Sequence, residues 1–523
     1  MVGVPGRSKG CKTCRKRKKG CDLQQPFCGN CIRGGLICEG YARQWTFIAN
    51  EPVPRGNATA VVARRSPAKS PLTFLPDQLN RTAFETQSVS IFFDLYFPAN
   101  ERQVLKSSTV GLDFRNWITV VQKLDLEDVA LRPALLAFCL ARIGVSHNDQ
   151  AAREQAIKLY GTALKEMNLR IRDNRRIHTD ETLAAGKLMA QYEMFHGSTS
   201  PELKTRGTNW KTHTEGVTML TQVRGPHGLV SENARLLFKD SRLSAVITAI
   251  VSRKPNFLAT TPWRTLPFES KPKDLSDELH DVMAMIPILL EESDLIHACQ
   301  DEGVAHKRRI RLFLQCRATD DTLRKWLADL SLRLPSPLPS VIRTPAEQNE
   351  TSEHDCFSFE LGDHMLAITL ALYWSTCIVL HSLIDMTFES LRSSSPTDVP
   401  GRLPDHIDPH RSATSISRSI GYFIRPEMGL WGVQLIGFPL GVALMYFLSS
   451  EEANADEERR RLSGNIAALS QMGLSLGTFL TSLQAATVPW FATDESENPW
   501  RTRSRLWFGG NIRPQARRDE DQR

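Results

Sequence analysis

The stretch CKTCRKRKKGCDLQQPFCGNCIRGGLIC, residues 11–38, decides how the N-terminal part of this chain folds. The spacing C-x2-C-x6-C occurs twice in it, with a shift of 17 residues: Cys11, Cys14, Cys21, Cys28, Cys31 and Cys38. A segment of about 30 residues is too short to fold on an apolar core. Because the first residues of the chain show no secretory signal, clustered thiols indicate a metal site and not disulfides.

The cysteine count predicts a particular kind of metal site. Two tetrahedral Zn²⁺ ions need eight ligand positions, and six thiolates fill eight positions only if two of them bridge both metals. The internal repeat makes its equivalent first members, Cys11 and Cys28, the natural bridges. The first histidine of the chain is His147, so the site is all-thiolate, and such a site strongly prefers Zn²⁺. We therefore expect two zinc ions, which supply the folding free energy, and a turn of helix at each C-x2-C pair.

The basic charge of the chain is concentrated in this module. Residues 1–38 hold nine Lys/Arg and one acid, Asp22, whereas the other 485 residues carry 56 basic and 57 acidic groups. A polyanion should therefore bind the module and not the body. A short helix end that carries Arg and Lys suits the major groove of double-stranded DNA, where they can reach guanine and phosphates. The DNA contacts that we predict are Lys9, Lys12, Arg15, Lys16, Arg17, Lys18 and Lys19.

Residues 11–38 resemble the fungal Zn(2)-Cys(6) binuclear cluster family, and GCKTCRKRKKGCD (10–22) carries most of the match. The resemblance implies that Cys11 and Cys28 bridge the two zinc ions. It also implies that Arg17 and Lys18 make base contacts in CGG half-sites. Gly20 departs from the family pattern, which often has lysine before the third cysteine, so one phosphate contact is missing or displaced.

The resemblance also implies a cellular role. We expect a nuclear transcription factor that acts on genes of RNA polymerase II and contacts coactivators. Control of a secondary-metabolite gene cluster is the main hypothesis, and control of nutrient-use genes is the alternative. A repressor that only occludes its DNA sites is a further alternative, which the sequence leaves open.

The rest of the chain has a helical pattern. Residues 41–83 are proline-rich and indicate a linker, residues 84–500 predict one large all-α regulatory domain, and residues 501–523 predict a disordered tail. Apolar residues at spacings of three and four predict helices in 84–500. Their approximate ranges are 88–97, 128–145, 150–172, 181–195, 210–223, 231–252, 275–299, 307–332, 361–385, 411–424, 430–449 and 456–483.

Short motifs in this body are similar to the helical regulatory domain found in one large subfamily of these factors. The motifs are HTEGVTML (213–220), RGP (224–226), RKPNFL (253–258) and RPEMGLWG (425–432). The overall fold class that we expect is mostly α, with a small zinc module followed by a large helical domain.

Three other stretches of the sequence could indicate a different function. GLSLG (473–477) fits the G-x-S-x-G motif of hydrolases, but no histidine follows His410, so we do not expect an enzyme. His406, Asp408 and His410 predict a polar loop in preference to a metal site. The apolar run 428–448 is long enough to cross a membrane, yet its Gln434 and Pro439 favour a buried core helix.

The oligomeric state follows from the linker. Many relatives of the cluster family pair through a coiled coil soon after the cysteines. Residues 41–83 contain prolines and no sustained heptads, so that device is not expected here. We therefore expect a monomer, or a homodimer that assembles through the helical body.

Overall fold

A computed structural model describes residues 11–23, 28–34, 36, 38, 77–96, 117–196, 203–334, 364–394, 402–425, 428–450 and 455–471. The chain divides into two compact units, residues 1–58 and 59–523. The first unit contains two one-turn helices, α1 (Lys12–Lys16) and α2 (Gly29–Arg33). The second unit is built from helices, and the described residues contain no strand.

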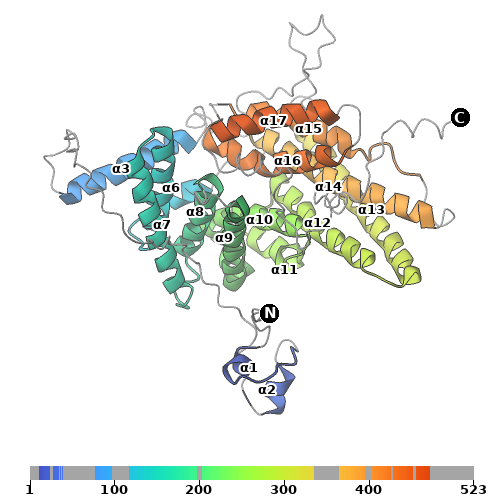
Figure 1. Ribbon diagram of the computed structural model, residues 1–523, viewed down its shortest axis with the longest axis horizontal. Helices are drawn as coiled ribbons and strands as arrows, with labels where there is room; N and C mark the ends of the chain where they lie inside the picture. Colours follow the sequence, from blue (N-terminus) through green and yellow to red (C-terminus); the bar gives the residue numbers. More distant parts are fainter. Residues whose placement is uncertain are drawn as a thin grey trace, which may run out of the picture. The chain divides into compact units, whose positions relative to one another are not determined.

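Figure 1 shows the helices of the second unit in chain order, from α3 in blue to α17 in orange-red. The α-helices are α3 (Asp77–Tyr96), α5 (Trp117–Val121), α6 (Leu131–Ser146), α7 (Gln150–Arg170), α8 (Asp180–His196), α9 (Leu203–Arg224), α10 (Glu232–Ser252), α11 (Thr261–Thr265), α12 (Leu275–His297), α13 (Glu302–Arg333), α14 (His364–Ser394), α15 (Pro409–Phe423), α16 (Gly429–Ser449) and α17 (Ala455–Gln471). Three short 3-10 helices join them: η1 (Pro226–Leu229), η2 (Phe257–Ala259) and η3 (Leu266–Phe268).

The mostly-α fold predicted from the sequence is confirmed, and most helices lie within a few residues of their predicted ranges. Several boundaries differ, among them the starts of α9 (residue 203, predicted 210) and α13 (residue 302, predicted 307) and the end of α14 (residue 394, predicted 385). Two further differences have a local explanation. Helix α3 begins at Asp77, so it extends into the stretch 41–83 that the sequence predicts as linker. The prediction misses this start because the first turns of α3 are polar and show no apolar pattern. Helix α6 begins at Leu131 and not at residue 128, because the Asp128 carboxylate accepts the backbone N–H of Ala130 and Leu131 ahead of the helix.

Acidic side chains fix where several helices begin. Four helices start after an aspartate whose carboxylate accepts a backbone N–H of the first turn: Asp149, Asp274, Asp301 and Asp408. Such caps satisfy donors that have no partner within the helix, and each contributes about 1 kcal/mol. At α12 the cap is reciprocal, because Asp277 also accepts the backbone N–H of Asp274.

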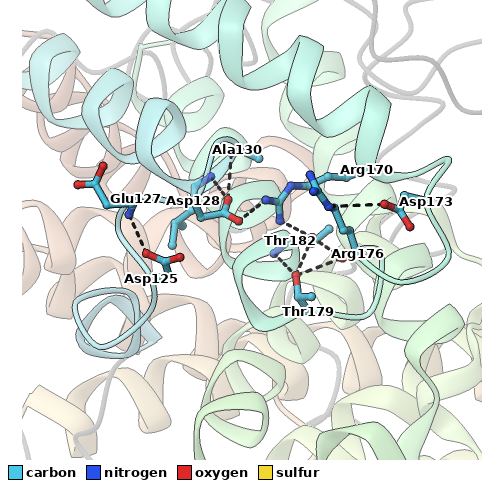
Figure 2. Close-up of polar contacts among 10 residues, drawn as sticks. Asp125, Glu127, Asp128, Ala130, Arg170, Asp173, Arg176, Thr179 and Thr182 are labelled. Carbon is cyan, nitrogen blue, oxygen red and sulfur yellow. Dashed lines mark hydrogen bonds and ion pairs between the residues drawn. The ribbon is translucent and has the colours of Figure 1, made fainter.

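One buried ion pair joins three elements of the N-terminal half of this unit (Figure 2). The guanidinium of Arg170, at the end of α7, pairs with Asp128 before α6. It also donates to the Thr182 hydroxyl in α8, at 3.0 Å. Because Arg170 is only 5% exposed, loss of Asp128 would leave a buried charge unpaired, which typically costs about 3–5 kcal/mol.

The last helices of the unit pack back onto the first. The Tyr96 hydroxyl at the end of α3 donates to the Gln434 side chain in α16, across 338 positions of sequence. Gly429 begins α16 with φ +58°, and a Cβ there would lie 2.7 Å from the Tyr96 carbonyl oxygen. Only glycine allows both this backbone conformation and this close approach.

Two helices are long and apolar enough to cross a membrane, α14 and α16. The most apolar stretch of α14 is 89% buried inside the unit, and the most apolar stretch of α16 is 61% buried. Helix α16 corresponds to the run 428–448, and it contacts α3, α14, α15 and α17. Both helices therefore have the surroundings of core helices in a helical domain.

Candidate metal centre and nucleic-acid interface

The N-terminal unit is built from two equivalent halves. Helix α1 and helix α2 begin 17 residues apart, at Lys12 and Gly29, and end 17 residues apart, at Lys16 and Arg33. This is the shift that relates the two cysteine triplets in the sequence. The buried cluster of the unit is made of cysteines, with Cys21 and Leu36 packed against it. Sulfur therefore occupies the place that an apolar core has in a larger domain.

The sulfur atoms of the six cysteines gather in two groups. Cys11, Cys14, Cys21 and Cys28 form one, and Cys11, Cys31 and Cys38 form the other; within each group the sulfurs lie within 4.8 Å of one another. If Cys11 and Cys28 bridge the two zinc ions, one ion has four ligands, and these are the four cysteines of the first group. Cys11 belongs to both groups, as a bridging ligand must, whereas Cys28 belongs to the first alone.

The sulfur separations fit zinc. Two pairs of Sγ atoms lie 3.7 Å apart within the ligand sets that bridging by Cys11 and Cys28 predicts: Cys11–Cys31 and Cys14–Cys28. The Sγ atoms of Cys14 and Cys31 are also 3.7 Å apart, but the same scheme assigns these two residues to different ions. A tetrahedral site with Zn–S bonds of about 2.3 Å has S···S edges of about 3.8 Å. A disulfide needs an S–S bond of about 2.05 Å, and the described cysteines are all free thiols. The donor set therefore suits tetrahedral zinc in a thiolate cluster.

Backbone amides orient these sulfurs. The N–H of Cys11 donates to the sulfur of Cys21, and the N–H of Cys28 donates to the sulfur of Cys38, both at 3.3 Å. These two hydrogen bonds are again equivalent under the 17-residue shift. Donors aimed at ligand sulfur stabilise its negative charge and fix its direction.

Burial alone works against ionised sulfur in this cluster. Desolvation, together with the hydrogen-bonded Cys11, raises the pKa of the Cys31 thiol to about 12. Desolvation also raises the pKa of Cys14 and of Cys11. Only thiolates ligate zinc, and a bound metal deprotonates its thiols outright. The cluster therefore suits a bound cation, because a positive charge would balance the negative charge of the buried thiolates.

The turn after α1 sets the direction of the basic side chains. Lys18 has a left-handed backbone, with φ +53°, and the N–H of Lys19 donates to the Cys14 carbonyl at 3.0 Å. The second half repeats this hydrogen bond, from the N–H of Leu36 to the Cys31 carbonyl at 2.9 Å. This turn at a helix end normally uses glycine. In the second half the sequence has Gly35 at the position equivalent to Lys18.

The charges of the two halves differ. The side chains of Arg17, Lys18 and Lys19 are exposed, and none of them has a hydrogen bond or ion pair to the described residues. The single basic residue of the second half, Arg33, lies 3.7 Å from the Asp22 carboxylate. The same carboxylate accepts the N–H of Gly29 at the start of α2, at 3.1 Å. Positive charge is therefore available at the first half and partly neutralised at the second.

The predicted site residues fall into three groups. The six cysteines come together, and Arg17, Lys18 and Lys19 form one exposed turn directly after α1. Lys12, Arg15 and Lys16 lie on α1, but the side chains of Lys12 and Arg15 are outside the described residues, and so is Lys9. The predicted helix end thus stops at Lys16, because the left-handed Lys18 ends the helical hydrogen bonding.

Sequence reasoning missed the contacts that hold the two halves together. Asp22 joins Arg33 and Gly29, and the Asn30 side chain donates to the Gly20 carbonyl at 3.2 Å. One signal was present: Asp22 is the sole acid among residues 1–38. An isolated acid in a basic module indicates an internal partner.

Comparison with known proteins gives two family matches. Residues 9–46 match the fungal Zn(2)-Cys(6) binuclear cluster domain. Residues 92–397 match the fungal-specific transcription factor domain. No solved structure matches the chain.

Curated relatives match parts of the chain. A transcriptional regulatory protein of Schizosaccharomyces pombe, named as uncharacterised, is 30% identical over 154 residues, which are 28% of this chain and 26% of that protein. An uncharacterised protein of Emericella nidulans is 24% identical over 227 residues, which are 42% of this chain and 45% of that protein. The chain therefore spans less than half the length of either relative.

Proposed function

We propose that this chain, which belongs to the family of proteins with the fungal-specific transcription factor domain, is a zinc-binding, DNA-binding transcriptional regulator. In this proposal it reads CGG-type half-sites through the turn after α1. The observation that carries this proposal is the exposed, unpaired cationic turn Arg17–Lys19, attached to the cysteine cluster through the hydrogen bond to the Cys14 carbonyl. A cation held in place by a metal cluster reaches a base edge with little loss of conformational freedom.

Arg17 and Lys18 are the base-reading residues in this proposal. Both types donate to O6 and N7 of guanine in the major groove, which suits the two guanines of CGG. The backbone of Lys18 supports its role, because a lysine occupies a left-handed position where the equivalent residue is Gly35. A strained residue kept in place of glycine indicates selection for its side chain.

The other basic residues of the module contact phosphates in this proposal: Lys9, Lys12, Arg15, Lys16 and Lys19. Such contacts position the protein on DNA and make its affinity depend on salt, whereas base contacts give sequence specificity.

The ligands of two zinc ions per chain are Cys11, Cys14, Cys21, Cys28, Cys31 and Cys38, with Cys11 and Cys28 as bridges. The two sulfur groups support this ligand set and the bridging role of Cys11, and the 3.7 Å separation of Cys14 and Cys28 supports Cys28 as a ligand of the same ion as Cys14. When bound, the zinc ions supply the folding free energy of the module. The backbone N–H groups of Cys11 and Cys28 orient two of the ligand sulfurs, those of Cys21 and Cys38. Metal analysis of the purified full-length protein tests the count, with two zinc ions per chain expected.

The regulatory role belongs to the helical body. The protein acts in the nucleus on genes of RNA polymerase II, and its body, residues 84–500, contacts coactivators. The alternative is a repressor that occludes its sites without any output from the body. A reporter assay with the body fused to an unrelated DNA-binding domain separates the two, because an occluding repressor gives no change in reporter activity.

The target genes are proposed to form a secondary-metabolite gene cluster, with nutrient-use genes as the alternative. Genome-wide occupancy of the tagged full-length protein tests both, beside a variant with Arg17→Ala and Lys18→Ala. Peaks that contain CGG triplets and disappear in the variant support the proposal, and the genes beneath them identify the pathway. Peaks that persist in the variant would exclude base reading by this turn.

The oligomeric state is proposed to be a monomer or a homodimer formed through the helical body. Analytical ultracentrifugation of the full-length protein distinguishes them. The spacing of the CGG triplets under occupancy peaks gives a second measurement, because a dimer should select paired half-sites at a fixed distance.

A further inference from the structure

The helical body contains a cleft that the DNA-binding role does not use. It has a volume of about 1090 Å³ and lies between α13, α14 and the N-terminal part of α15. Binding sites for small molecules usually measure about 300–1,000 Å³ and combine an apolar lining with a few fixed polar groups. The cleft therefore has the size of such a site.

One wall of the cleft is fastened by a buried carboxylate. Asp320 in α13 is 1% exposed and accepts hydrogen bonds from His381 at 3.0 Å and His406 at 2.7 Å. The backbone N–H of Asp408 donates to Nδ1 of His381, so the proton of that imidazole lies on Nε2 and points at Asp320. Although burial alone would raise the pKa of Asp320, these two hydrogen bonds lower it. The loop that carries His406 is thereby held against α13 and α14.

His406 and His410 do not meet at a common site. His406 faces Asp320, whereas the ring of His410 packs edge-on against Phe447, with centroids 5.6 Å apart. The groups of metal-type ligands among the described residues are the two cysteine groups. The stretch 405–410 thus forms a wall of the cleft and not a metal centre.

The remaining wall is apolar and aromatic. Leu327 comes from α13, and Leu370, Tyr373 and Trp374 come from α14. Tyr373 stacks on Trp326 at a centroid distance of 5.6 Å, which holds its ring in place. Trp374 is partly exposed and lines the cleft. Such a wall suits an apolar or aromatic group.

The charges available in the cleft are positive. Its three acids are already engaged: Asp320 by two histidines, Asp408 as the cap of α15, and Asp405 by Arg402 at 3.7 Å. Arg411 lines the cleft, is exposed, and has no side-chain partner among the described residues. Arg324 also lines it, and its one partner is the exposed Asp321 at 3.9 Å. An anion would therefore find the guanidinium of Arg411, and that of Arg324 is engaged only in an exposed ion pair.

A hydroxyl group in the same wall lacks a partner. In α15 the hydroxyls of Ser412, Ser415 and Ser419 bond to the carbonyl four residues earlier. The Thr414 hydroxyl oxygen is buried in the cleft and has no hydrogen-bond partner among the described residues. This hydroxyl can therefore donate a hydrogen bond to a molecule bound in the cleft.

We propose that this cleft binds a small organic anion with an aromatic or apolar body. The body lies against Trp374 and Leu370, the anionic group pairs with Arg411 and Arg324, and Thr414 supplies a hydrogen bond. The binding activity goes beyond DNA recognition and needs no DNA. Its failure would therefore leave the proposed reading of CGG sites intact.

The test uses two fluorescent probes on the full-length protein. The first is 8-anilino-1-naphthalenesulfonate, an aromatic anion, and the second is N-phenyl-1-naphthylamine, which has the same rings without the sulfonate. We expect saturable binding of the anion at one site per chain. Arg411→Glu should weaken the anion about tenfold and leave the neutral probe within twofold, because only the anion pairs with the guanidinium.

Two further variants keep this test decisive. Arg460→Glu changes an exposed arginine of α17 outside the cleft and should leave both probes unaffected. Ala328→Trp adds a large side chain at an exposed position of the cleft wall and should weaken both probes. Equal affinity of the anion for the wild type, Arg411→Glu and Ala328→Trp would overturn the proposal, since the probe would then bind elsewhere. Circular dichroism of each variant checks that the helical body is folded.

Discussion

The sulfur atoms of Cys14 and Cys28 lie 3.7 Å apart, although the two residues belong to different halves of the N-terminal module. Cys14 lies in α1 and Cys28 directly precedes α2, so this contact joins the two equivalent halves. Among the described residues, the buried members of this cluster are all cysteines, and the partly buried Leu36 packs against them. The cohesion of the module therefore depends on what the sulfurs bind, and this dependence can be measured.

Removal of zinc should unfold the module and leave the helical body folded. A chelator should abolish binding to DNA, and Cys28→Ser should do the same, because structural zinc contributes about 10 kcal/mol or more to such a module. The helical circular dichroism of the full chain should fall only slightly. Cys299→Ser, a cysteine outside the module, is the matched control and should bind DNA normally. DNA binding that survives chelation would contradict the metal-dependent fold.

Gly20→Lys should strengthen DNA binding. A Cβ added at Gly20 would meet no atom within 4 Å, and the backbone φ of Gly20 is not in the left-handed region. A lysine therefore fits at this position. One added phosphate contact should raise the affinity severalfold at low salt and steepen the slope of log K against log[salt] by about one.

The matched control for this gain is Ile32→Lys, which adds the same charge to the exposed face of α2. We expect a smaller gain in DNA affinity and little change in the salt-dependence slope, because the proposal places no phosphate contact on α2. Equal gains from both variants would mean that general electrostatic attraction, and not a positioned contact, explains the effect.

Two substitutions at Lys18 separate its backbone from its side chain. Lys18→Gly relieves the left-handed strain, so the zinc-loaded module should be about 1 kcal/mol more stable than with Lys18→Ala. Both variants lack the ammonium group, and both should lose discrimination between CGG and scrambled DNA to the same degree. Thermal unfolding and fluorescence anisotropy measure the two effects. Wild-type discrimination by Lys18→Gly would remove Lys18 from the base-reading residues.

His280 in α12 predicts part of the acid sensitivity of the body. Its imidazole is 6% exposed, and neither ring nitrogen has a hydrogen-bond partner among the residues that the structure describes. Burial, together with nearby Arg242, lowers the pKa of His280 to about 3. An unfolded histidine titrates near 6.5. Between these pH values the unfolded chain binds a proton that the folded chain does not. The free energy of unfolding therefore falls as the pH falls, by up to about 1.4 kcal/mol per pH unit.

His280→Leu should remove this contribution. We expect equal or greater stability at pH 7, because an unsatisfied polar group is lost, and a decrease between pH 7 and pH 5 that is about 2 kcal/mol smaller than in the wild type. Urea denaturation at the two pH values measures it. His227→Leu, at an exposed histidine, should follow the wild type. The same pH dependence in His280→Leu and wild type would show that His280 is not buried as described.

The sequence predicted the helices well because their apolar faces repeat at helical spacing over several turns. It missed α5 and α11, since five residues are too few to establish a period. The cleft could not be predicted either. Asp320 meets partners 61 and 86 positions away, at His381 and His406, and no local pattern reports such contacts.

The cysteine spacing, by contrast, predicted that the six sulfurs gather, because metal ligands must lie within a few ångströms of one another. The basic run gave the position of the exposed cations but not the pairing of Asp22 with Arg33, which makes the two halves electrostatically unequal. That pairing depends on the three-dimensional arrangement of the halves.

Base reading by the turn after α1 is measured as the discrimination between two DNA duplexes. The affinity of the full-length protein for a CGG duplex and for a scrambled duplex is measured at fixed salt, for wild type, the double variant Arg17→Ala/Lys18→Ala, and Arg33→Ala. The double variant should lose about 2–4 kcal/mol of discrimination, because a good base contact contributes about 1–3 kcal/mol. Arg33→Ala should keep it, because Arg33 pairs with Asp22 in an exposed ion pair. Undiminished discrimination by the double variant, or an equal loss in Arg33→Ala, would contradict the account.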